Sequence, residues 1–277
     1  MDPLRNDAGG RMTTKVARGT ARGPRGLVGH TLEQAWGGLP STIARSGAVG
    51  RVELKVLLDV PPGDAVAALQ LSGGPVASRE VYYLDTPDLA LREQGILIRA
   101  RIPAHGGAQL VVKLRTSVPR ELPKSVARLP NLCVELDALP YETQWCASVR
   151  SRPRRLPLRP DGRIGRRRRQ GWGHIFSADQ QAFLARLAED PALVAEIRPF
   201  GPASVRRFRG QAAGLPRVAV ESWTYPDGYR LVELSTKCAP RRAHHTAQQL
   251  RRLLAAHQIA PRRMQLSKTE ISLRRFG

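Results

Sequence analysis

Charged side chains alternate with apolar ones along most of the segments that could form strands. In residues 51–56, Arg51, Glu53 and Lys55 alternate with valine and leucine. Successive side chains of a strand point to opposite faces, so this period of two predicts strands with one charged and one apolar face. By this pattern the sequence predicts about eight strands, at residues 51–56, 81–84, 98–102, 112–115, 135–137, 207–209, around 221 and at 232–237.

The charged faces favour a closed barrel over an open sheet. One such strand would fit a sheet with a face in water, but nearly all of these strands carry charge on one face, and both signs occur. A barrel turns the charged faces toward a shared interior and packs the apolar faces under helices. Ser177 with Gln180, and Thr246 with Gln249, have capping-box spacing before leucine-rich stripes, which predicts two such helices. We therefore predict an α+β fold, an eight-stranded antiparallel β-barrel with flanking helices.

The predicted interior contains many charges of both signs. The inward cations are Arg51, Lys55, Arg99, Arg101, Lys113, Arg115, Arg207, Arg209 and Lys237. The inward carboxylates are Glu53, Glu135, Asp137, Glu221 and Glu233. Like charges in a confined space repel strongly unless they are neutralised. A polyanion would neutralise the cations and a hard divalent cation such as Mg²⁺ or Mn²⁺ the carboxylates, so these residues predict a polyphosphate-like ligand bound with a metal.

Two further basic segments lie outside the alternating pattern. The chain has 277 residues, with 45 Lys and Arg against 23 Asp and Glu, and a net charge of +22. Residues 1–47 lack a hydrophobic period and predict a disordered basic tail before a domain at 48–277. An Arg-rich loop is predicted as an insertion at about 148–173. Its run Arg150–Arg169 could bind nucleic acid non-specifically through phosphate contacts, although a solvated loop is the favoured interpretation.

Composition excludes several other classes of protein. No apolar run approaches the length of a membrane-spanning helix, and the first residues lack the apolar segment of a secretory signal. The three cysteines, Cys133, Cys146 and Cys238, are far apart and odd in number, which argues against a disulfide framework. We therefore expect a cytoplasmic protein with reduced thiols and no membrane partner.

Six segments in order resemble a CYTH domain, the triphosphate tunnel metalloenzyme group. They are RVELKVLL, VYYLDTPDLALREQGILIRARI, LVVKLR, CVELD, RLVELSTK and LSKTEISL, within residues 49–137 and 203–275. The most specific piece is residues 82–101. The resemblance implies an eight-stranded antiparallel tunnel that binds triphosphate through Lys and Arg and holds Mg²⁺ or Mn²⁺ through Glu. The group includes inorganic, thiamine and RNA triphosphatases and class IV adenylyl cyclases.

The resemblance also implies individual roles. Phosphate contacts would be Lys55, Arg99, Arg101, Lys113, Arg115, Arg207, Lys237 and Lys268. Glu53 and Glu233 would be the catalytic, metal-binding carboxylates, with Glu135, Asp137 and Glu221 in support.

Two departures from the group's motifs bear on activity. The opening motif, usually Glu-x-Glu-x-Lys, has Arg51 in place of its first carboxylate, and the late Glu-x-Glu motif has Ser235 in place of its second. Three functions stay open as a result. The first is metal-dependent hydrolysis of a triphosphate-containing small molecule or polyphosphate. The second is a degenerate tunnel that binds polyphosphate, a nucleotide or an RNA 5′ end without turnover, and the third is adenylyl cyclisation.

Overall fold

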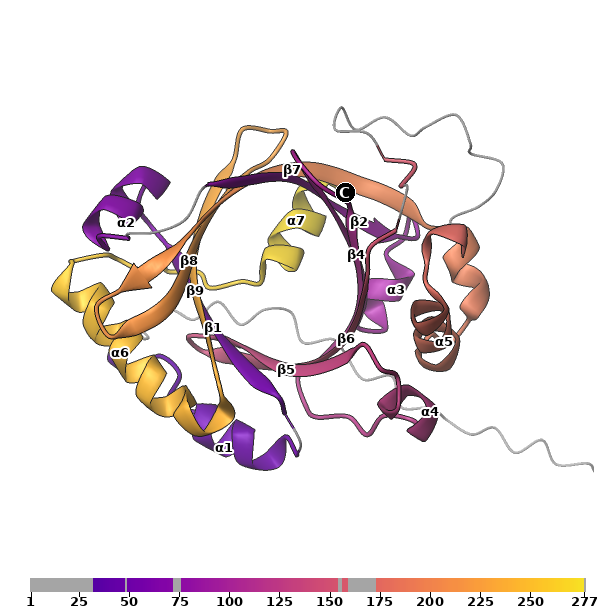
Figure 1. Ribbon diagram of the computed structural model, residues 1–277, viewed down its shortest axis with the longest axis horizontal. Helices are drawn as coiled ribbons and strands as arrows, with labels where there is room; N and C mark the ends of the chain where they lie inside the picture. Colours follow the sequence, from indigo (N-terminus) through magenta and orange to yellow (C-terminus); the bar gives the residue numbers. More distant parts are fainter. Residues whose placement is uncertain (1–31, 48, 72–75, 154–155, 159–172, 277) are drawn as a thin grey trace, which may run out of the picture.

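The computed structural model describes residues 32–47, 49–71, 76–153, 156–158 and 173–276. Within these residues, nine strands close into a barrel in the order β1-β5-β6-β4-β3-β2-β7-β8-β9. The strands are β1 (Arg51–Leu58), β2 (Ala77–Asp85), β3 (Ile96–Pro103), β4 (Gln109–Thr116), β5 (Leu132–Leu139), β6 (Glu142–Ser151), β7 (Arg198–Ala212), β8 (Leu215–Thr224) and β9 (Arg230–Cys238). Neighbouring strands are antiparallel except β1 and β5, which are parallel. The predicted barrel is confirmed (Figure 1), with β6 as an additional strand.

β6 lies partly where the Arg-rich loop was predicted. It pairs with β4 as far as Ser151 and with β5 as far as Val149, so residues 148–151 belong to the barrel wall. Three successive inward positions, Gln144, Cys146 and Ser148, carry no charge, so the alternation gave no signal for this strand, although Arg150 farther along it lines the cavity. Most of the predicted loop, at 154–155 and 159–172, lies outside the described residues.

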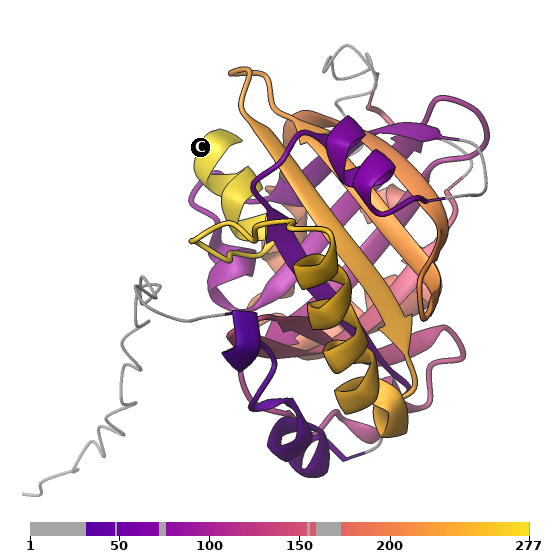
Figure 2. The same ribbon diagram turned by 90° about the vertical axis from the view of Figure 1, so that its left-hand side faces the viewer.

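Helices surround the barrel. They are α1 (Leu39–Arg45), α2 (Pro62–Ala68), α3 (Ala90–Glu93), α4 (Lys124–Ala127), α5 (Ala178–Leu187), α6 (Ala243–Ala256) and α7 (Lys268–Phe276). Short 3₁₀ turns are η1 (Leu32–Gln34), η3 (Gly173–Ile175), η4 (Pro191–Ala195) and η5 (Pro240–Arg242). Seen from the side, α6 crosses the outside of the wall, and α7 lies at one end of the barrel (Figure 2). No helix among the described residues combines the length and apolar character needed to cross a bilayer.

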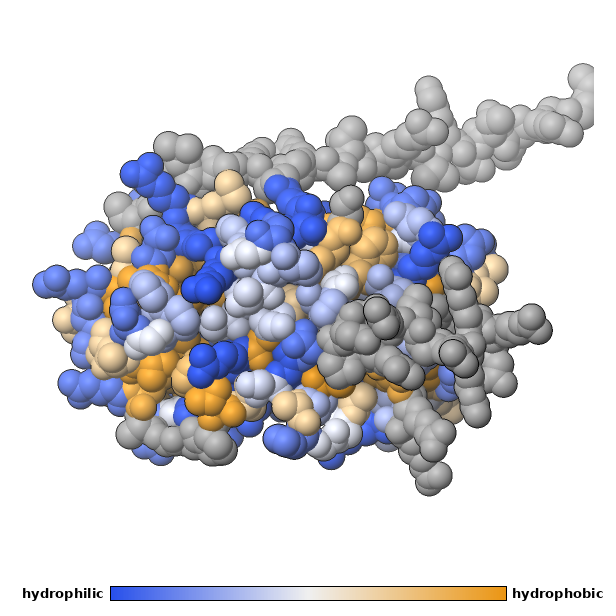
Figure 3. Space-filling model, turned by 90° about the horizontal axis from the view of Figure 1, so that it is seen from above, coloured by the Kyte–Doolittle hydropathy of each residue, from blue (hydrophilic) through white to orange (hydrophobic). Residues whose placement is uncertain are grey.

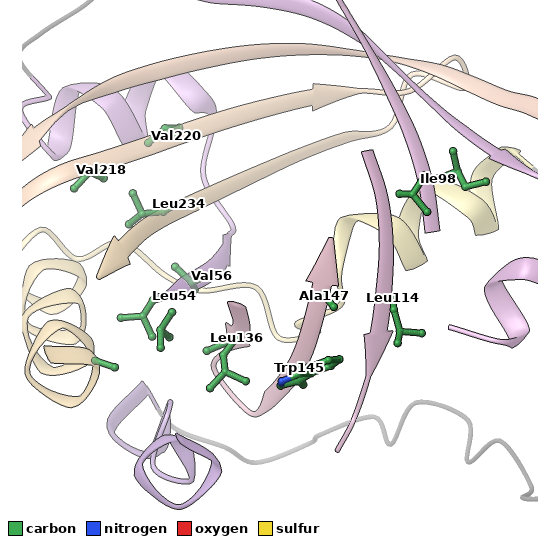
Figure 4. Close-up of a cluster of buried hydrophobic side chains, with 14 of the residues drawn as sticks. Leu54, Val56, Ile98, Leu114, Leu136, Trp145, Ala147, Val218, Val220 and Leu234 are labelled. Atoms are coloured by element: carbon green, nitrogen blue, oxygen red, sulfur yellow. The ribbon is translucent and has the colours of Figure 1, made fainter. Parts of the chain in front are cut away.

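The outward faces of the strands form the larger core. Leu54, Val56 and Leu136 are fully buried in it and lie on the outer side of the wall (Figure 4). Leu250 and Leu254 of α6 pack into the same cluster. The apolar faces under helices are thus as predicted, because each strand hides one face under a helix while the other faces the lumen. The space-filling view shows hydrophilic residues over much of one outer face, with separate apolar patches (Figure 3).

The inward faces form two zones. Toward one end they are charged. Toward the other they are apolar, where Leu57, Val205 and Leu231 pack with Trp223 and with Ile271 of α7 in a second buried cluster. The apolar zone, with α7 against it, is the α7 end of the barrel.

One of the two predicted capping boxes is present. Ser177 caps α5, because its hydroxyl accepts from the Gln180 N–H and the Gln180 side chain accepts from the Ser177 N–H. The second is wrong. Thr246 lies inside α6, which begins at Ala243, and its hydroxyl donates to the Arg242 carbonyl one turn back. A threonine oxygen can bond in either direction, so the spacing alone was ambiguous.

The predicted disorder of residues 1–47 is wrong for the part that is described. Residues 32–47 contain η1 and α1, and Trp36 and Leu39 are buried in the main core. The Trp36 indole donates to the Ala138 carbonyl at 3.0 Å, and Arg251 of α6 donates to the Ala35 carbonyl at 2.8 Å. Buried apolar residues and these two hydrogen bonds hold this segment against the core, although it has no regular hydrophobic period. Residues 1–31 lie outside the described residues.

The segment with the most specific resemblance builds a turn between β2 and β3. The Asp85 carboxylate is buried and accepts from the N–H groups of Leu91 and Arg92 at 3.0 Å each, which caps α3. Gly95 follows with φ +78°, and a Cβ there would lie 2.6 Å from the Arg115 carbonyl oxygen. The aspartate and the glycine are therefore structural residues that fix the register of β3 against β4.

Candidate functional site

The charged zone encloses a cavity of about 310 Å³. Its lining includes all thirteen sequence-predicted site residues: Glu53, Lys55, Arg99, Arg101, Lys113, Arg115, Glu135, Asp137, Arg207, Glu221, Glu233, Lys237 and Lys268. Twelve come from alternate positions of strands, and Lys268 begins α7. In all, eleven Lys and Arg line the cavity against five Asp and Glu, an excess of six positive charges.

Asp137 is at the centre of one group of ion pairs. Its side chain is 5% exposed and lies 2.9 Å from Lys55 Nζ, 3.1 Å from Lys113 Nζ and 3.1 Å from an Arg115 guanidinium nitrogen. Burial alone would raise the pKa of Asp137, but the three cations hold it well below its usual range. The carboxylate is therefore ionised in the folded protein.

Glu53 and Glu135 complete this group. Lys237 Nζ lies 3.2 Å from Glu53 and 3.3 Å from Glu135, and Lys113 Nζ lies 3.1 Å from Glu135. The pKa of both carboxyl groups is lowered, because the neighbouring lysines outweigh burial, which acts in the opposite direction. One oxygen each of Glu53, Glu135 and Asp137 lies within 4.8 Å of the others. We call these three residues the carboxylate triad.

Glu221 and Glu233 form a separate group around Lys268. Lys268 Nζ lies 2.5 Å from Glu221 and 2.6 Å from Glu233, above the Trp223 ring at 5.1 Å. Arg79 also binds Glu221 at 2.6 Å. The pKa of Glu221 is well below its usual range, because these cations outweigh burial. The pKa of Glu233 is raised, because burial outweighs Lys268 and Lys55.

The five carboxylates predicted as one metal set are therefore two groups. The triad has the donor chemistry for Mg²⁺ or Mn²⁺, since both prefer carboxylate oxygens. Its oxygens are paired with lysines in this structure, so a metal would compete with them. Glu233 and Glu221 hold an ammonium group instead.

Four cations of the lining have no ion pair with any described carboxylate. They are Arg51, Arg99, Arg101 and Arg209, each on an inward position. Arg101 hydrogen-bonds only the neutral Gln109, at 2.8 Å. Burial, together with the like charges of Arg99 and Arg79, lowers the pKa of Arg101 well below its usual value. These groups leave positive charge that the protein itself does not neutralise.

The cavity continues into a second hollow of about 590 Å³ at the end opposite α7, which we call the mouth. Arg51, Arg207, Arg209 and Lys237 line both spaces, and Arg217 lines the mouth alone. Arg51, where the group's motif has a carboxylate, stands directly opposite Glu135 on β5. Ser235, the other departure, pairs with Lys55 across β1 and β9 and is buried.

Sequence reasoning missed three residues near the site. Arg79 precedes the segment recognised as a strand, and Arg150 lines the cavity from β6 although it was assigned to the Arg-rich loop. Tyr83 points inward from β2, because its cross-strand partner is the inward Arg99. The parity of β2 could have identified Arg79 and Tyr83 if the strand had been extended toward its start.

Comparisons with known proteins support the fold and go no further. No family model matches the sequence, and no curated protein matches it. Among solved structures, the chain is similar to the candidate adenylyl cyclase HpAC1 from Hippeastrum, which is described by its dominant triphosphatase activity. The TM-score is 0.55 and the identity is 14%, over 82% of this chain and 96% of that one. The candidate adenylate cyclase bh2851 from Bacillus halodurans has a TM-score of 0.53 and 14% identity, over 80% of this chain and 98% of that one. The expected resemblance is confirmed as a likeness of fold: the chain forms the closed, helix-flanked barrel of the CYTH-type structures.

Proposed function

We propose that the tunnel binds the phosphate chain of a triphosphate or polyphosphate-type ligand and hydrolyses a phosphoanhydride bond with Mg²⁺ or Mn²⁺. The observation that carries this proposal is the excess of six positive charges around an enclosed cavity. Uncompensated cations in a low-dielectric space are costly, and a polyanion removes that cost. A linear phosphate chain has the charge and the narrow shape for such a tunnel.

The carboxylate triad is the proposed metal site. Glu53, Glu135 and Asp137 would hold the ion, which when bound would polarise a phosphoryl group. Lys55, Lys113 and Lys237 now pair with these carboxylates, and the lysine side chains are long enough to turn to phosphate oxygens instead. The same residues thus serve the empty and the filled tunnel.

Glu233 is the proposed general base. Its raised pKa distinguishes it from the other four carboxylates of the cavity, whose pKa values are lowered. A carboxylate with a raised pKa accepts a proton from attacking water more readily than a fully ion-paired one. Lys268 fixes its orientation at 2.6 Å. Glu53 is essential for the proposed hydrolysis, because it is one of the three carboxylates that would hold the metal.

The fold neighbours favour hydrolysis over cyclisation as the first reaction to test. HpAC1 is described by a dominant triphosphatase activity although it is named as a candidate cyclase. None of the described residues that line this tunnel distinguishes cyclisation from hydrolysis. Adenylyl cyclisation therefore stays the lesser alternative.

A binding module without turnover is the second candidate function. Arg51 and Ser235 favour it, because they replace two motif carboxylates while the cationic lining is kept. In this form the tunnel would bind a polyphosphate or nucleotide without needing a metal.

Nucleic acid, bound along Arg150–Arg169, is an additional proposed partner. The proposed location is the cytoplasm, and the free thiols Cys133, Cys146 and Cys238 are in keeping with it.

Phosphate release and calorimetry separate these functions. Purified protein is titrated with tripolyphosphate in Mg²⁺ and in chelator, and phosphate release is followed in parallel. Hydrolysis predicts Mg²⁺-dependent release that Glu53→Ala abolishes, while the matched variant Glu80→Ala, whose carboxylate bonds Ser204 outside the cavity, retains it. Equal tripolyphosphate affinity in Mg²⁺ and in chelator, without phosphate release, would establish the binding module. Absence of binding would refute both.

A further inference from the structure

The mouth has a strongly cationic lining of its own. Among the described residues it contains five cations: Arg51, Arg207, Arg209, Arg217 and Lys237. Its one described carboxylate, Glu53, is already paired with Lys55 and Lys237 at 3.2 Å each. Arg51, Arg209 and Arg217 are not among the phosphate contacts that the resemblance implies. We call these three residues the mouth arginines.

Strand parity turns the mouth arginines toward one another. Arg217 has the inward parity of Glu221 on β8, and Arg209 has that of Arg207 on β7. Arg51 begins β1, and no mouth arginine has an ion pair with a described carboxylate. Like charges that face one hollow from three strands repel each other. An anion in the mouth removes this repulsion, and guanidinium groups bind phosphate oxygens through paired hydrogen bonds.

Both departures from the group's motifs make this part of the barrel more positive. Arg51 stands in place of a carboxylate and changes the local charge by +2, and Ser235 does the same with a change of +1. Ser235 also lies opposite Ala219 across β8 and β9, so two small inward side chains line the mouth there. The substitutions that weaken a metal site thus favour an anion site at the mouth.

The lining favours a bare phosphate chain over a nucleoside in the mouth. None of the described residues that line the tunnel cavity or the mouth is aromatic, whereas bases are commonly held by stacking on aromatic side chains. Arg51, Arg207, Arg209 and Lys237 line both spaces, so the cations continue without a break from the tunnel into the mouth. Further phosphate units match this path, because each one adds negative charge and hydrogen-bond acceptors.

We propose that the mouth arginines form an anion site for the phosphate units of a polyphosphate that extend beyond the tunnel. This inference rests on the proposed phosphate-binding function and narrows its ligand to an inorganic polyphosphate longer than tripolyphosphate. The site needs no metal, because the arginines themselves supply the positive charge. Arg217 is a specificity-determining residue for chain length, since it lines the mouth and not the tunnel cavity.

The test measures how affinity depends on chain length. Calorimetry in chelator uses tripolyphosphate, a longer linear polyphosphate of one defined length, and ATP, on wild type, Arg217→Gln and the control Arg206→Gln. Arg206 is exposed on the outer face of β7, above the Phe208 ring, and lines neither space. Glutamine removes the charge and keeps a polar side chain, and an exposed arginine can be replaced without unfolding the barrel.

The expected result is a loss of affinity that is confined to the longer chain. Arg217→Gln should weaken the longer polyphosphate roughly 10-fold, as for one lost hydrogen bond to a charged group, and tripolyphosphate less than about two-fold. A longer chain also gains affinity because it can bind in more registers. That gain is the same in both proteins, so the change in the ratio of the two affinities reports the mouth alone. ATP should bind no more tightly than tripolyphosphate, since the mouth offers its base no stacking partner.

Three results would overturn the inference and leave phosphate binding in the tunnel standing. They are an unchanged ratio of the two affinities in Arg217→Gln, the same change of ratio in Arg206→Gln, and tighter binding of ATP than of tripolyphosphate by wild type. The first would remove the site, the second would show a general effect of surface charge, and the third would assign the mouth to a nucleoside. If wild type binds none of the three ligands, the proposed function fails and the mouth site fails with it.

Discussion

Replacing Asp137 with asparagine should strongly destabilise the empty tunnel. The carboxylate is 5% exposed and pairs with Lys55, Lys113 and Arg115 at 2.9–3.1 Å. Asparagine keeps the shape and removes the charge, which leaves three buried cations short of their shared partner. Breaking a buried ion pair from one side costs about 3–5 kcal/mol. For a domain of this size that corresponds to a fall in Tm on the order of 10 °C.

The assay is urea unfolding followed by fluorescence, with and without tripolyphosphate in chelator. The control is Asp59→Asn, since Asp59 is 71% exposed and its ion pair with Arg262 spans 4.0 Å, so it should cost no more than about 0.5 kcal/mol. Tripolyphosphate should stabilise Asp137→Asn more than wild type, because the ligand supplies negative charge to cations that have lost their carboxylate partner. Equal stabilisation of both proteins would contradict the placement of phosphate against these cations.

The pH dependence gives an independent check. A carboxylate whose folded pKa is lowered contributes stability that is fully present above its unfolded pKa, about 3.9. That contribution is lost as the pH falls toward the folded value, which for Asp137 lies well below its usual range. The difference in unfolding free energy between wild type and Asp137→Asn should therefore be constant near neutrality and shrink below about pH 4. An unfolding free energy of Asp137→Asn within about 1 kcal/mol of the wild-type value at pH 7 would refute the assigned role of this carboxylate.

Two further predictions concern the departures from the motif and the basic segment. The double substitution Arg51→Glu with Ser235→Glu should raise the affinity for Mg²⁺, measured by calorimetry without phosphate, because it restores two carboxylates beside the triad. Unchanged affinity would show that residues 51 and 235 do not stand at metal-ligand positions. Deleting 159–169 should abolish any binding of single-stranded RNA whose affinity falls steeply with salt, as measured by anisotropy at several salt concentrations, whereas binding that survives the deletion would place the RNA elsewhere.

The alternation of charge was sufficient to predict which charged strand residues line the cavity, because every position of one parity faces the lumen. Lys113 on β4 and Glu221 on β8 lie far apart in sequence, yet closure of the barrel brings both into one cavity. The pattern could not show how the carboxylates divide. Which cation reaches Glu233 depends on the start of α7, where Lys268 enters the lumen, and strand parity carries no information on a helix.

The parts that were mispredicted lacked a periodic signal. Three successive inward residues of β6, Gln144, Cys146 and Ser148, are uncharged. The segment around Trp36 is held by buried apolar residues and by hydrogen bonds to distant backbone. The apolar half of the lumen was missed for a related reason. Leu57 and Val205 share the parity of charged residues, but an apolar side chain at an inward position looks in sequence like the end of a strand.

The charge of the lining explains how the tunnel could tolerate the loss of two motif carboxylates. In the empty cavity, Glu53, Glu135 and Asp137 are paired with lysines, so a divalent cation that binds alone must break these pairs and leave the lysines unneutralised. A phosphate chain offers the lysines other oxygens and thereby frees the triad. Phosphate and metal then favour each other by the same factor, because such coupling is reciprocal. Arg51 opposes the metal most when no phosphate is present, since a bound chain neutralises its charge. The substitutions at 51 and 235 should accordingly weaken metal binding in the empty tunnel far more than in the filled one, and the proposed hydrolysis would take place in the filled one.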